Sequence, residues 1–319
     1  MSAILITGGA GFIGSSLADK LIEQGKEVIV IDNFNDYYDV SLKKSNIKNN
    51  LSNPKYRLYQ ADIEDKQVLG KIFSENKISA VVHLAARAGV RPSLENPLAY
   101  IKTNILGTVN ILEEMKEHHI KKLVFASSSS VYGNCRVEKF SEELNVREPI
   151  SPYAATKSSC EQICYTYMHL YGINTICLRF FTVYGPRQRP DLAINKFTHL
   201  IDVEQSIPMY GNGNTCRDYT YIDDIVDGIC SAIEYNKTSY EIINLGGGEP
   251  ITLKNMIETI EKTLNKKAII DHLPMQPGDV DKTICDWSKA KALLNYIPKT
   301  SFVEGISKFI NWLNNTKKI

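Results

Sequence analysis

A tyrosine and a lysine stand four residues apart in the segment "SPYAATK", at Tyr153 and Lys157. If this segment is helical, both side chains project from the same face of the helix. A tyrosine side chain normally has a pKa of about 10, and a neighbouring ammonium group favours its phenolate form. The pair therefore predicts an acid–base catalyst that interconverts an alcohol and a carbonyl group. The spacing alone is weak support, because such pairs are common on solvent-exposed helix faces.

Serines supply a second part of this predicted site. The segment "ASSSSVYG", residues 126–133, lies at the end of the strand predicted upstream of Tyr153. Its small hydroxyl groups are able to hold the oxygen atom that reacts. The serines and the tyrosine–lysine pair together favour a catalytic site over an unrelated pair on a helix surface.

A glycine-rich segment near the N-terminus, "TGGAGFIG", places Gly8, Gly11 and Gly14 between a predicted strand and a predicted helix. Glycines there allow a tight turn, a close approach of a pyrophosphate to the backbone, and close packing of a helix whose N-terminus attracts the anion. The next predicted strand ends in Asp32, whose carboxylate can accept both hydroxyl groups of an adenosine ribose and repels a 2′-phosphate. The sequence therefore predicts a site for NAD rather than NADP, and the alternative is a pair of strands that binds no nucleotide.

Two arginines follow a predicted strand in the segment "RFFTVYGPRQRPD", residues 179–191. Arg187 and Arg189 lie where the chain leaves this strand, which is a usual position for residues that bind a ligand. Their side chains predict an anion in the site, and the spacing alone does not identify that anion.

The elements that must position these residues alternate through the first half of the chain. Helical patterns run from Phe12 to Gln24, over 97–116 and over 153–170. Short β-rich runs that are apolar on both faces are typical of strands buried in a parallel sheet. These runs are "AILIT", "EVIVID", "YRLYQAD", "AVVHLAA", "KLVFASS" and "NTICLRFF". The alternation predicts an α/β fold with a Rossmann-type doubly wound parallel sheet and helices on both of its faces.

The sequence also predicts how the chain divides. Residues 1–180 are expected to form the dinucleotide-binding domain, to which segments near 216–248 return. Residues 181–319 are expected to form mainly a smaller C-terminal α/β lobe, which binds the substrate over the carboxyl ends of the strands. Within this lobe, residues 252–319 are expected to supply two helices around the Pro-rich stretch "DHLPMQPGDVD".

Composition argues against several other classes of protein. The chain has 319 residues, 43% of them hydrophobic, and its net charge of +1 argues against a nucleic-acid-binding surface. Seven scattered cysteines, without a CxxC pair or a Cys/His cluster, argue against a metal site and favour reduced thiols. The N-terminus starts directly with a strand and shows neither a signal peptide nor a membrane span, which predicts a cytoplasmic protein.

Taken in order, the motifs resemble the extended short-chain dehydrogenase/reductase family, and in particular its nucleotide-sugar epimerase branch. They are Gly8-Gly-Ala-Gly11-Phe-Ile-Gly14, Asp32-Asn33, Asp62-Ile63, "HLAA" (83–86), Asn104, "SSSSVYG" and Tyr153-x-x-x-Lys157. The resemblance covers essentially the whole chain, and the joint pattern is highly specific. It implies a tightly bound NAD that is regenerated in each cycle, and a UDP-sugar in the cleft between the lobes.

The resemblance also implies roles for individual residues toward the cofactor. The backbone at Phe12 and Ile13 is expected to touch the pyrophosphate, and Asp62 and Ile63 are expected to meet the adenine. The residues expected near the nicotinamide half are Ala85, Asn104, Phe181 and Lys157, the last of which also binds the nicotinamide ribose.

Substrate contacts follow from the same resemblance. Ser128, with Ser129 and Ser130 close by, is expected to contact the 4-hydroxyl group of the sugar. The contacts expected for the nucleotide are Arg217 at the diphosphate, Tyr210 stacked on the uracil and Asp279 at the uridine ribose. A structural ion pair of the arginine and core packing of the aromatic ring are the alternatives.

Several positions resemble UDP-glucuronate 4-epimerases more than UDP-glucose 4-epimerases. The UDP-galactose/glucose enzymes usually carry Asn at the position of Thr182 and Arg at the position of Gln276. Thr182, the loop around Arg189, "MQPGD" and "NDYYDVSLKK" resemble the UDP-glucuronate enzymes instead. Arg189 is therefore expected to bind the 6-carboxylate of the sugar with Thr182 as its hydroxyl partner, whereas Arg187 is expected to be solvated.

The reaction type is suggested by Ser129 and Ser130. Related UDP-xylose synthases typically carry Glu in this segment and related dehydratases carry Asp-Glu, so the serines favour epimerisation without decarboxylation or elimination. Two departures from the branch leave the sugar open: Arg187-Gln188 stands where Trp-Gly is frequent, and Arg87 stands where Gln is frequent. The alternatives are a UDP-glucose or UDP-N-acetylglucosamine 4-epimerase, a net oxidoreductase, dehydratase or decarboxylase, and a nucleotide-sensing protein without catalysis.

Members of this branch commonly form homodimers, which implies one here. The expected interface is a four-helix bundle made from residues 97–116 and 153–170 of each subunit. An exposed apolar stripe on these helices is expected for such an interface, and core packing would explain the same residues.

Overall fold

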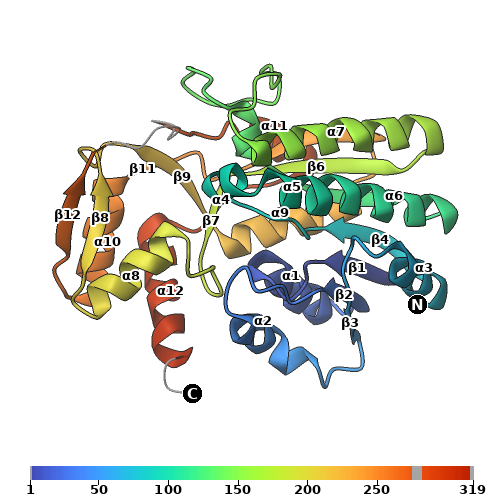
Figure 1. Ribbon diagram of the computed structural model, residues 1–319, viewed down its shortest axis with the longest axis horizontal. Coiled ribbons are helices and arrows are strands. Elements are labelled where there is room, and N and C mark those ends of the chain that lie inside the picture. The colour runs from blue at the N-terminus through green and yellow to red at the C-terminus, as the bar shows by residue number, and fades with distance from the viewer. Residues whose placement is uncertain (1, 275–281, 317–319) are drawn as a thin grey trace.

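The computed structural model describes residues 2–274 and 282–316 of the chain (Figure 1). Its largest sheet has seven strands, all parallel, in the order β10-β6-β5-β4-β1-β2-β3. The strands are β1 (Ala3–Thr7), β2 (Val28–Asp32), β3 (Tyr56–Gln60), β4 (Ile78–His83), β5 (Lys122–Ser128), β6 (Asn174–Phe180) and β10 (Tyr240–Leu245). The predicted Rossmann-type sheet is confirmed, since the strand order reverses between β1 and β4 as it does in doubly wound folds.

Helices cover both faces of this sheet (Figure 1). Helices α1 (Phe12–Glu23) and α9 (Ile222–Glu234) pack together on one face. Helices α3 (Lys66–Glu75), α6 (Gly107–Glu117) and α7 (Pro152–Tyr171) lie on the other. Alternate side chains of the buried strands β1 and β2 therefore enter two different hydrophobic cores, which explains why these strands are apolar at successive positions.

The helix expected over 97–116 is present but is not a regular α-helix. It consists of α5 (Pro97–Tyr100), the π-helix η2 (Ile101–Leu106) and then α6. A π-helical turn holds more residues than an α-helical turn and is frequently found at functional sites. This turn carries Asn104 close to the carboxyl end of β4, where the candidate site lies.

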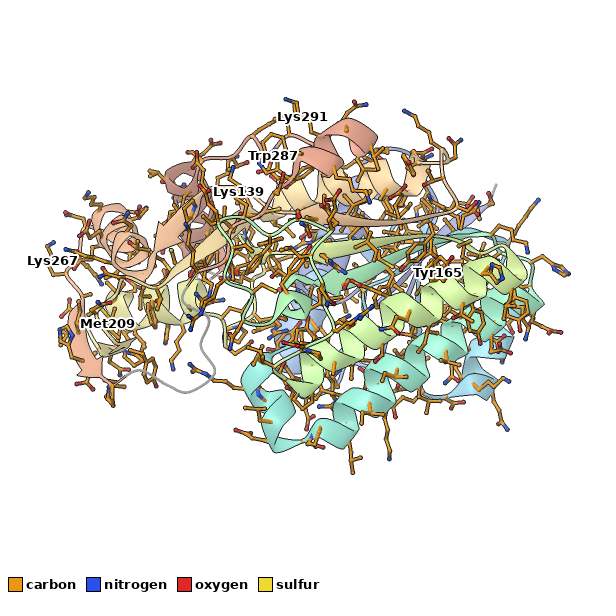
Figure 2. The ribbon with its side chains drawn as sticks, turned by 90° about the horizontal axis from the view of Figure 1, so that it is seen from above. Lys139, Tyr165, Met209, Lys267, Trp287 and Lys291 are labelled. Carbon is orange, nitrogen blue, oxygen red and sulfur yellow. The ribbon has the colours of Figure 1, made fainter. Side chains whose placement is uncertain are left out.

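The smaller lobe follows the carboxyl end of β6 and contains two short sheets. In one, β8 (Ser206–Tyr210) pairs with β12 (Ile269–Leu273). In the other, β9 (Cys216–Tyr221) lies between β7 (Thr182–Tyr184) and β11 (Pro250–Thr252). Met209 and Lys267 mark this lobe in Figure 2, at the opposite end of the molecule from Tyr165 on α7.

Three helices lie in the part of 252–319 that the structure describes, so the expectation of two was wrong. They are α10 (Leu253–Leu264), α11 (Ser288–Leu294) and α12 (Phe302–Thr316). The additional helix, α11, has seven residues and packs against α9 and β10, so its apolar pattern is too short to mark a helix in the sequence. The remaining short elements are α2 (Val40–Ile47), η1 (Lys48–Asn50), α4 (Val90–Glu95), η3 (Ser129–Tyr132) and α8 (Ala193–Asp202).

Membrane-spanning helices and metal-ligand clusters are both missing from the described ranges. None of the helices there has both the length and the apolar character needed to cross a membrane, and no three His, Cys, Asp or Glu side chains there are grouped so that they could hold a metal ion. All seven cysteines carry free thiols.

A buried ion pair joins α7 to the sheet. Arg179 in β6 donates from Nε and Nη2 to the two carboxylate oxygens of Glu161 in α7, at 2.9 and 2.7 Å. The two side chains are only 2% and 4% exposed. Ser127 at the end of β5 donates to the same carboxylate at 2.5 Å, and the Tyr132 ring lies 4.8 Å from the guanidinium. These contacts offset the unfavourable free energy of removing the two charged groups from water.

We expect Arg179→Leu to lower the free energy of unfolding by about 3–5 kcal/mol, because it leaves the Glu161 carboxylate buried without a cation. Urea unfolding monitored by circular dichroism measures this loss. As a control, Lys308→Ala breaks the exposed pair with Glu304 and should cost less than about 1 kcal/mol. If the two variants lost equal stability, the buried pair would not be what holds α7 to the sheet.

Candidate active site

A cleft of about 400 Å³ opens at the carboxyl ends of β1, β2, β4, β5 and β6. The start of α7 and the loop after β7 complete its walls. The predicted residues that the cleft brings together are Gly8, Gly11, Phe12, Ile13, Gly14, Asp32, Asn33, Ile63, Ala85, Ser128, Ser129, Ser130, Tyr153, Lys157, Phe181, Thr182 and Arg189. Residues predicted from separate motifs thus face one cavity.

Two residues predicted for the cofactor support the cleft wall rather than line it. The Asp62 carboxylate accepts a hydrogen bond from Asn33 Nδ2 at 2.7 Å. Asn104 is buried and holds the loop after β4, because its Oδ1 accepts from the Arg87 backbone N–H at 2.8 Å and its Nδ2 donates to the Arg87 carbonyl oxygen at 3.0 Å. The same Nδ2 donates to Thr156 Oγ1 in α7 at 3.0 Å.

Predicted contacts of the nucleotide part of the substrate lie elsewhere in the smaller lobe. Tyr210 ends β8, and the guanidinium of Arg91 from α4 lies 5.5 Å from the centre of its ring. Arg217 in β9 donates from Nη1 to the Cys216 carbonyl oxygen at 3.0 Å. Neither is among the residues that line the cleft, and Asp279 lies outside the described residues.

The glycine turn forms a cradle that side chains would fill. Gly8 has φ +70°, and a Cβ atom there would lie 2.9 Å from the Ala85 Cα atom. A Cβ atom at Gly14 would lie 2.3 Å from the Gly8 carbonyl oxygen. The N-terminus of α1 has no side-chain cap at Gly11, so its N–H groups and helix dipole are available to an anion. The turn therefore fits a pyrophosphate.

Asp32 is held at the next strand end by the backbone. Its Oδ2 accepts a hydrogen bond from the Ala10 N–H at 3.0 Å, and its Oδ1 accepts from the Phe34 N–H at 2.9 Å. The carboxylate lines the cleft and is the only one that does so among the described residues. It can accept the hydroxyl groups of a ribose, and it would repel a phosphate at the same place.

Tyr153 enters the cleft from the first turn of α7. Ser151 caps this helix by accepting a hydrogen bond from the Ala154 N–H at 3.1 Å. Burial raises the pKa of the Tyr153 phenol above its ordinary value, while a hydrogen bond with Ser128 and the positive charge of Arg189 act in the opposite direction. The structure thus supplies two groups that favour the phenolate, and one of them is a cation that the sequence assigned to the substrate.

Lys157 is held by a backbone acceptor that the sequence did not single out. Its Nζ donates to the Ala126 carbonyl oxygen at 2.6 Å and lies 4.9 Å from the Phe125 ring. Burial lowers the pKa of this lysine to about 8. The side chain lines the cleft beside Tyr153, so its expected contact with the nicotinamide ribose stays a prediction.

The serines form a short helical turn at the end of β5. Ser128 caps η3, because its Oγ accepts from the Ser130 N–H at 3.2 Å and donates to Ser130 Oγ at the same distance. This turn points Ser128, Ser129 and Ser130 into the cleft beside Tyr153. Hydroxyl groups, and no carboxylate, therefore surround the phenol on this side.

Both arginines of the loop after β7 are paired with acidic side chains. Arg189 lines the cleft and makes two hydrogen bonds to Asp191. Arg187 was expected to be solvated, yet its Nη2 lies 2.7 Å from Asp19 Oδ2 in α1, and its φ is +69°. Arg187 therefore ties the loop to the glycine-rich half of the site, whereas Arg189 faces the cavity.

The sequence did not single out the residues that support Arg189. Tyr37 lines the cleft with its ring 5.1 Å from the Arg189 guanidinium, and its hydroxyl donates to the Ala88 carbonyl oxygen at 2.9 Å. Lys43 donates to the Asn35 carbonyl oxygen at 2.8 Å in the same wall. The segment "NDYYDVSLKK" contains Tyr37 and Lys43, so it could have pointed to these residues. Periodic patterns in a sequence do not predict contacts between segments about 150 residues apart, so the contact with Arg189 could not be foreseen.

Comparison with known proteins decides the family. The family described as GDP-mannose 4,6 dehydratase matches residues 5–309. The chain belongs to this family. Membership confirms the resemblance to extended short-chain dehydrogenase/reductases. Over 313 residues, this GDP-mannose dehydratase-family chain is 47% identical to a UDP-glucuronate 4-epimerase of Thermodesulfobacterium geofontis, with 98% of the chain and 96% of the relative covered.

Solved structures of family relatives have the same fold. The UDP-glucuronic acid 4-epimerase of Bacillus cereus, in complex with UDP-glucuronic acid and NAD, is 36% identical with a TM-score of 0.91, and the match covers 98% of this chain and 99% of that one. The UDP-glucose 4-epimerase of Thermotoga maritima, with UDP-glucose, is 34% identical with a TM-score of 0.90 and 99% of each chain covered. The family fold therefore accommodates both a charged and a neutral sugar.

Proposed function

We propose that the protein interconverts UDP-glucuronate and UDP-galacturonate by inverting carbon 4 of the sugar, with NAD as its cofactor. The position of Arg189 carries this proposal, because its side chain lines the same cleft as Tyr153, Ser128 and Thr182. A guanidinium binds a carboxylate through two parallel hydrogen bonds and so distinguishes a uronate from a neutral hexose. The relatives named as UDP-glucuronate 4-epimerases support the same substrate.

The glycine cradle and Asp32 fit NAD. We assign the pyrophosphate to the backbone of Phe12 and Ile13 and the adenosine ribose to Asp32. The other assigned residues are Gly8, Gly11, Gly14, Asn33 and Ile63 toward the adenosine half and Ala85, Lys157 and Phe181 toward the nicotinamide half. Asp62 and Asn104 act indirectly, by holding Asn33 and the loop after β4. When bound, NAD+ would supply a reversible hydride acceptor for carbon 4 of the sugar.

The side chains of the chain itself move the proton. Tyr153, as the phenolate, removes the proton of the 4-hydroxyl group and later returns it. Ser128 orients the oxygen atom beside the phenol, and Arg189 favours the phenolate electrostatically. Lys157, whose pKa of about 8 keeps it largely protonated at neutral pH, adds a second cation near the reacting oxygen.

The absence of a second carboxylate favours epimerisation. Asp32 is the only carboxylate among the described residues that line the cleft, and it lies at the dinucleotide end. A 4-keto uronate is a β-keto acid, which loses carbon dioxide when its carboxylate rotates into alignment with the ketone. Arg189 and Thr182 would fix that carboxylate at one angle and so oppose the loss.

Inversion requires the 4-keto sugar to turn while the nucleotide stays in place. We assign the nucleotide to the smaller lobe, with Arg217 at the diphosphate, Tyr210 at the uracil and Asp279 at the uridine ribose. This assignment accords with a division in which residues 1–180 and the returning segments near 216–248 bind NAD, and residues 181–319 mainly bind the substrate. The free thiols are consistent with a cytoplasmic location.

The test uses purified protein without added NAD and follows the anomeric protons by NMR. We expect UDP-galacturonate to appear from UDP-glucuronate, and UDP-glucose and UDP-N-acetylglucosamine to react slowly. Arg189→Ala should lower kcat/KM for UDP-glucuronate by at least about 30-fold, because the substrate carboxylate loses its cation. Arg187→Ala is the matched control and should change it little, since Arg187 pairs with Asp19.

Other outcomes of this experiment discriminate among the alternatives. Turnover of neutral sugars only, unaffected by Arg189→Ala, would discard the carboxylate site and retain the Tyr153 chemistry. Net formation of reduced nicotinamide would indicate an oxidoreductase. Full activity of Tyr153→Phe would contradict the mechanism for every sugar.

Ser128→Ala should shift the pH dependence of kcat. The Ser128 hydrogen bond lowers the Tyr153 pKa, so its removal raises that pKa. The phenolate then forms only at higher pH, and the rising limb of kcat against pH moves upward. Ser128→Thr retains the hydroxyl and should leave the limb in place. A lower kcat with an unshifted limb in Ser128→Ala would show that Ser128 does not tune the phenol.

We further infer a homodimer formed through a four-helix bundle of α5–α6 and α7. Large apolar side chains are exposed along these helices, and they are Leu98, Ile101, Leu106, Tyr165, Leu170 and Tyr171. Leu98 is 69% exposed at the start of the helical segment, and Tyr165 is 52% exposed on the outer face of α7 (Figure 2). Exposed apolar side chains of this size are typical of a protein–protein interface.

Light scattering after gel filtration tests the interface. The chain has a mass of 35.9 kDa, and we expect twice that value in solution. Leu98→Asp with Tyr165→Asp should yield the monomer, because two charges would be buried in the interface. Val303→Asp, at an exposed apolar position of α12, is the matched control and should leave the mass unchanged. A monomeric native protein would rule out the proposed homodimer and would leave the proposed reaction unaffected.

A further inference from the structure

Arg189 already has a carboxylate partner within its own loop. Its Nε donates to Asp191 Oδ1 at 3.0 Å, and its Nη2 donates to Asp191 Oδ2 at 2.7 Å. These two parallel bonds are the arrangement in which a guanidinium binds any carboxylate, including that of a uronate. Asp191 therefore presents to Arg189 the same chemical group as the proposed substrate, on the Nε/Nη2 edge of the guanidinium.

The two partners differ in how firmly they are held. The Arg189 side chain is 17% exposed, and the Tyr37 ring lies 5.1 Å from its guanidinium carbon. The Tyr37 ring is fixed in turn by its hydrogen bond to the Ala88 carbonyl oxygen. Asp191 is 43% exposed, so its carboxylate can turn into water at small cost. The guanidinium is thus the fixed member of the pair, and the carboxylate is the member that can leave.

We propose that Asp191 and the substrate carboxylate alternate as partners of Arg189. The inference rests on the proposed function, because it requires a uronate in the cleft. On binding, the uronate carboxylate takes the two donors and Asp191 turns toward solvent. When the 4-keto sugar turns, its carboxylate must leave Arg189, and Asp191 returns.

This exchange explains how a site that grips a carboxylate can still let the sugar turn. Without a substitute partner, the guanidinium would pass through a state in which it is largely withdrawn from water and unpaired, which is costly. Asp191 is tethered two residues away, so it is always available to take over the two donors. Asp191 acts through Arg189 and does not touch the reacting atoms, which makes it a positioning residue.

The test is Asp191→Asn, which keeps the size of the side chain and removes its charge. Calorimetry should show UDP-glucuronate binding roughly two- to fivefold more tightly, because the competing carboxylate is gone. The affinity for UDP-glucose and for UDP should stay unchanged. kcat for UDP-glucuronate should fall, and a larger fraction of the bound nicotinamide should be reduced in the steady state, which its fluorescence reports. Asp227→Asn, which neutralises the half-exposed partner of Lys20 on α9, is the matched control and should alter none of these quantities.

Each other result has a defined meaning. Weaker binding of UDP-glucuronate to Asp191→Asn would show that Asp191 only orients Arg189, and the exchange would be wrong. Unchanged affinity would place the substrate carboxylate on another edge of Arg189 and also overturn the exchange. Tighter binding of UDP-glucuronate with an unchanged kcat would show that Asp191 does not help the 4-keto sugar to turn. Failure of the proposed function looks different, since native protein and Arg189→Ala would then bind UDP-glucuronate equally well.

Discussion

The buried carboxylate of Glu161 is the point on which the active-site geometry depends. It accepts two hydrogen bonds from Arg179 in β6 and one from Ser127 in β5, while it belongs to α7. Because α7 also carries Tyr153 and Lys157, one side chain fixes the catalytic helix against two adjacent strand ends. The position of the phenol relative to Ser128 is thus set from inside the core, and the hydrogen bond from Lys157 Nζ to the Ala126 carbonyl oxygen adds a second tie between α7 and β5.

Several charged side chains in and beside the cleft already have partners within the chain. Arg187 is paired with Asp19, Arg189 with Asp191, and the Asp32 carboxylate is held by two backbone N–H groups. A carboxylate that binds the Nε/Nη2 edge of Arg189 must therefore displace Asp191, whereas the N–H groups at the start of α1 are open to an anion. The pair also affects Tyr153, because the positive charge of Arg189 lowers the pKa of the phenol. Asp191 is hydrogen-bonded to the same guanidinium.

Local patterns were enough to predict the sheet, the glycine cradle, and the position of Tyr153 and the serines in one cleft. Each of these depends on residues that are close in sequence: a strand followed by glycines, or Tyr153 and Lys157 on successive turns of one helix. The features that could not be predicted depend on contacts between distant segments, such as Tyr37 against Arg189 and Arg91 against Tyr210. The sequence also gave no sign that Lys157 would bind the Ala126 carbonyl oxygen, because the choice between that acceptor and the phenol is made by three-dimensional geometry.

The π-helix η2 has a consequence for how relatives of this chain should be aligned. A π turn adds one residue to a helix, and one residue rotates everything on one side of it by about 100° relative to the other. Here the rotation lets Asn104 face the loop after β4 while Ile111 and Leu112, further along the same helix, face the sheet. A one-residue gap at this point in an alignment would therefore mark a different side chain behind the loop after β4 and a turned outer surface of the helix. It would not be the harmless change of length that a gap in a loop usually represents.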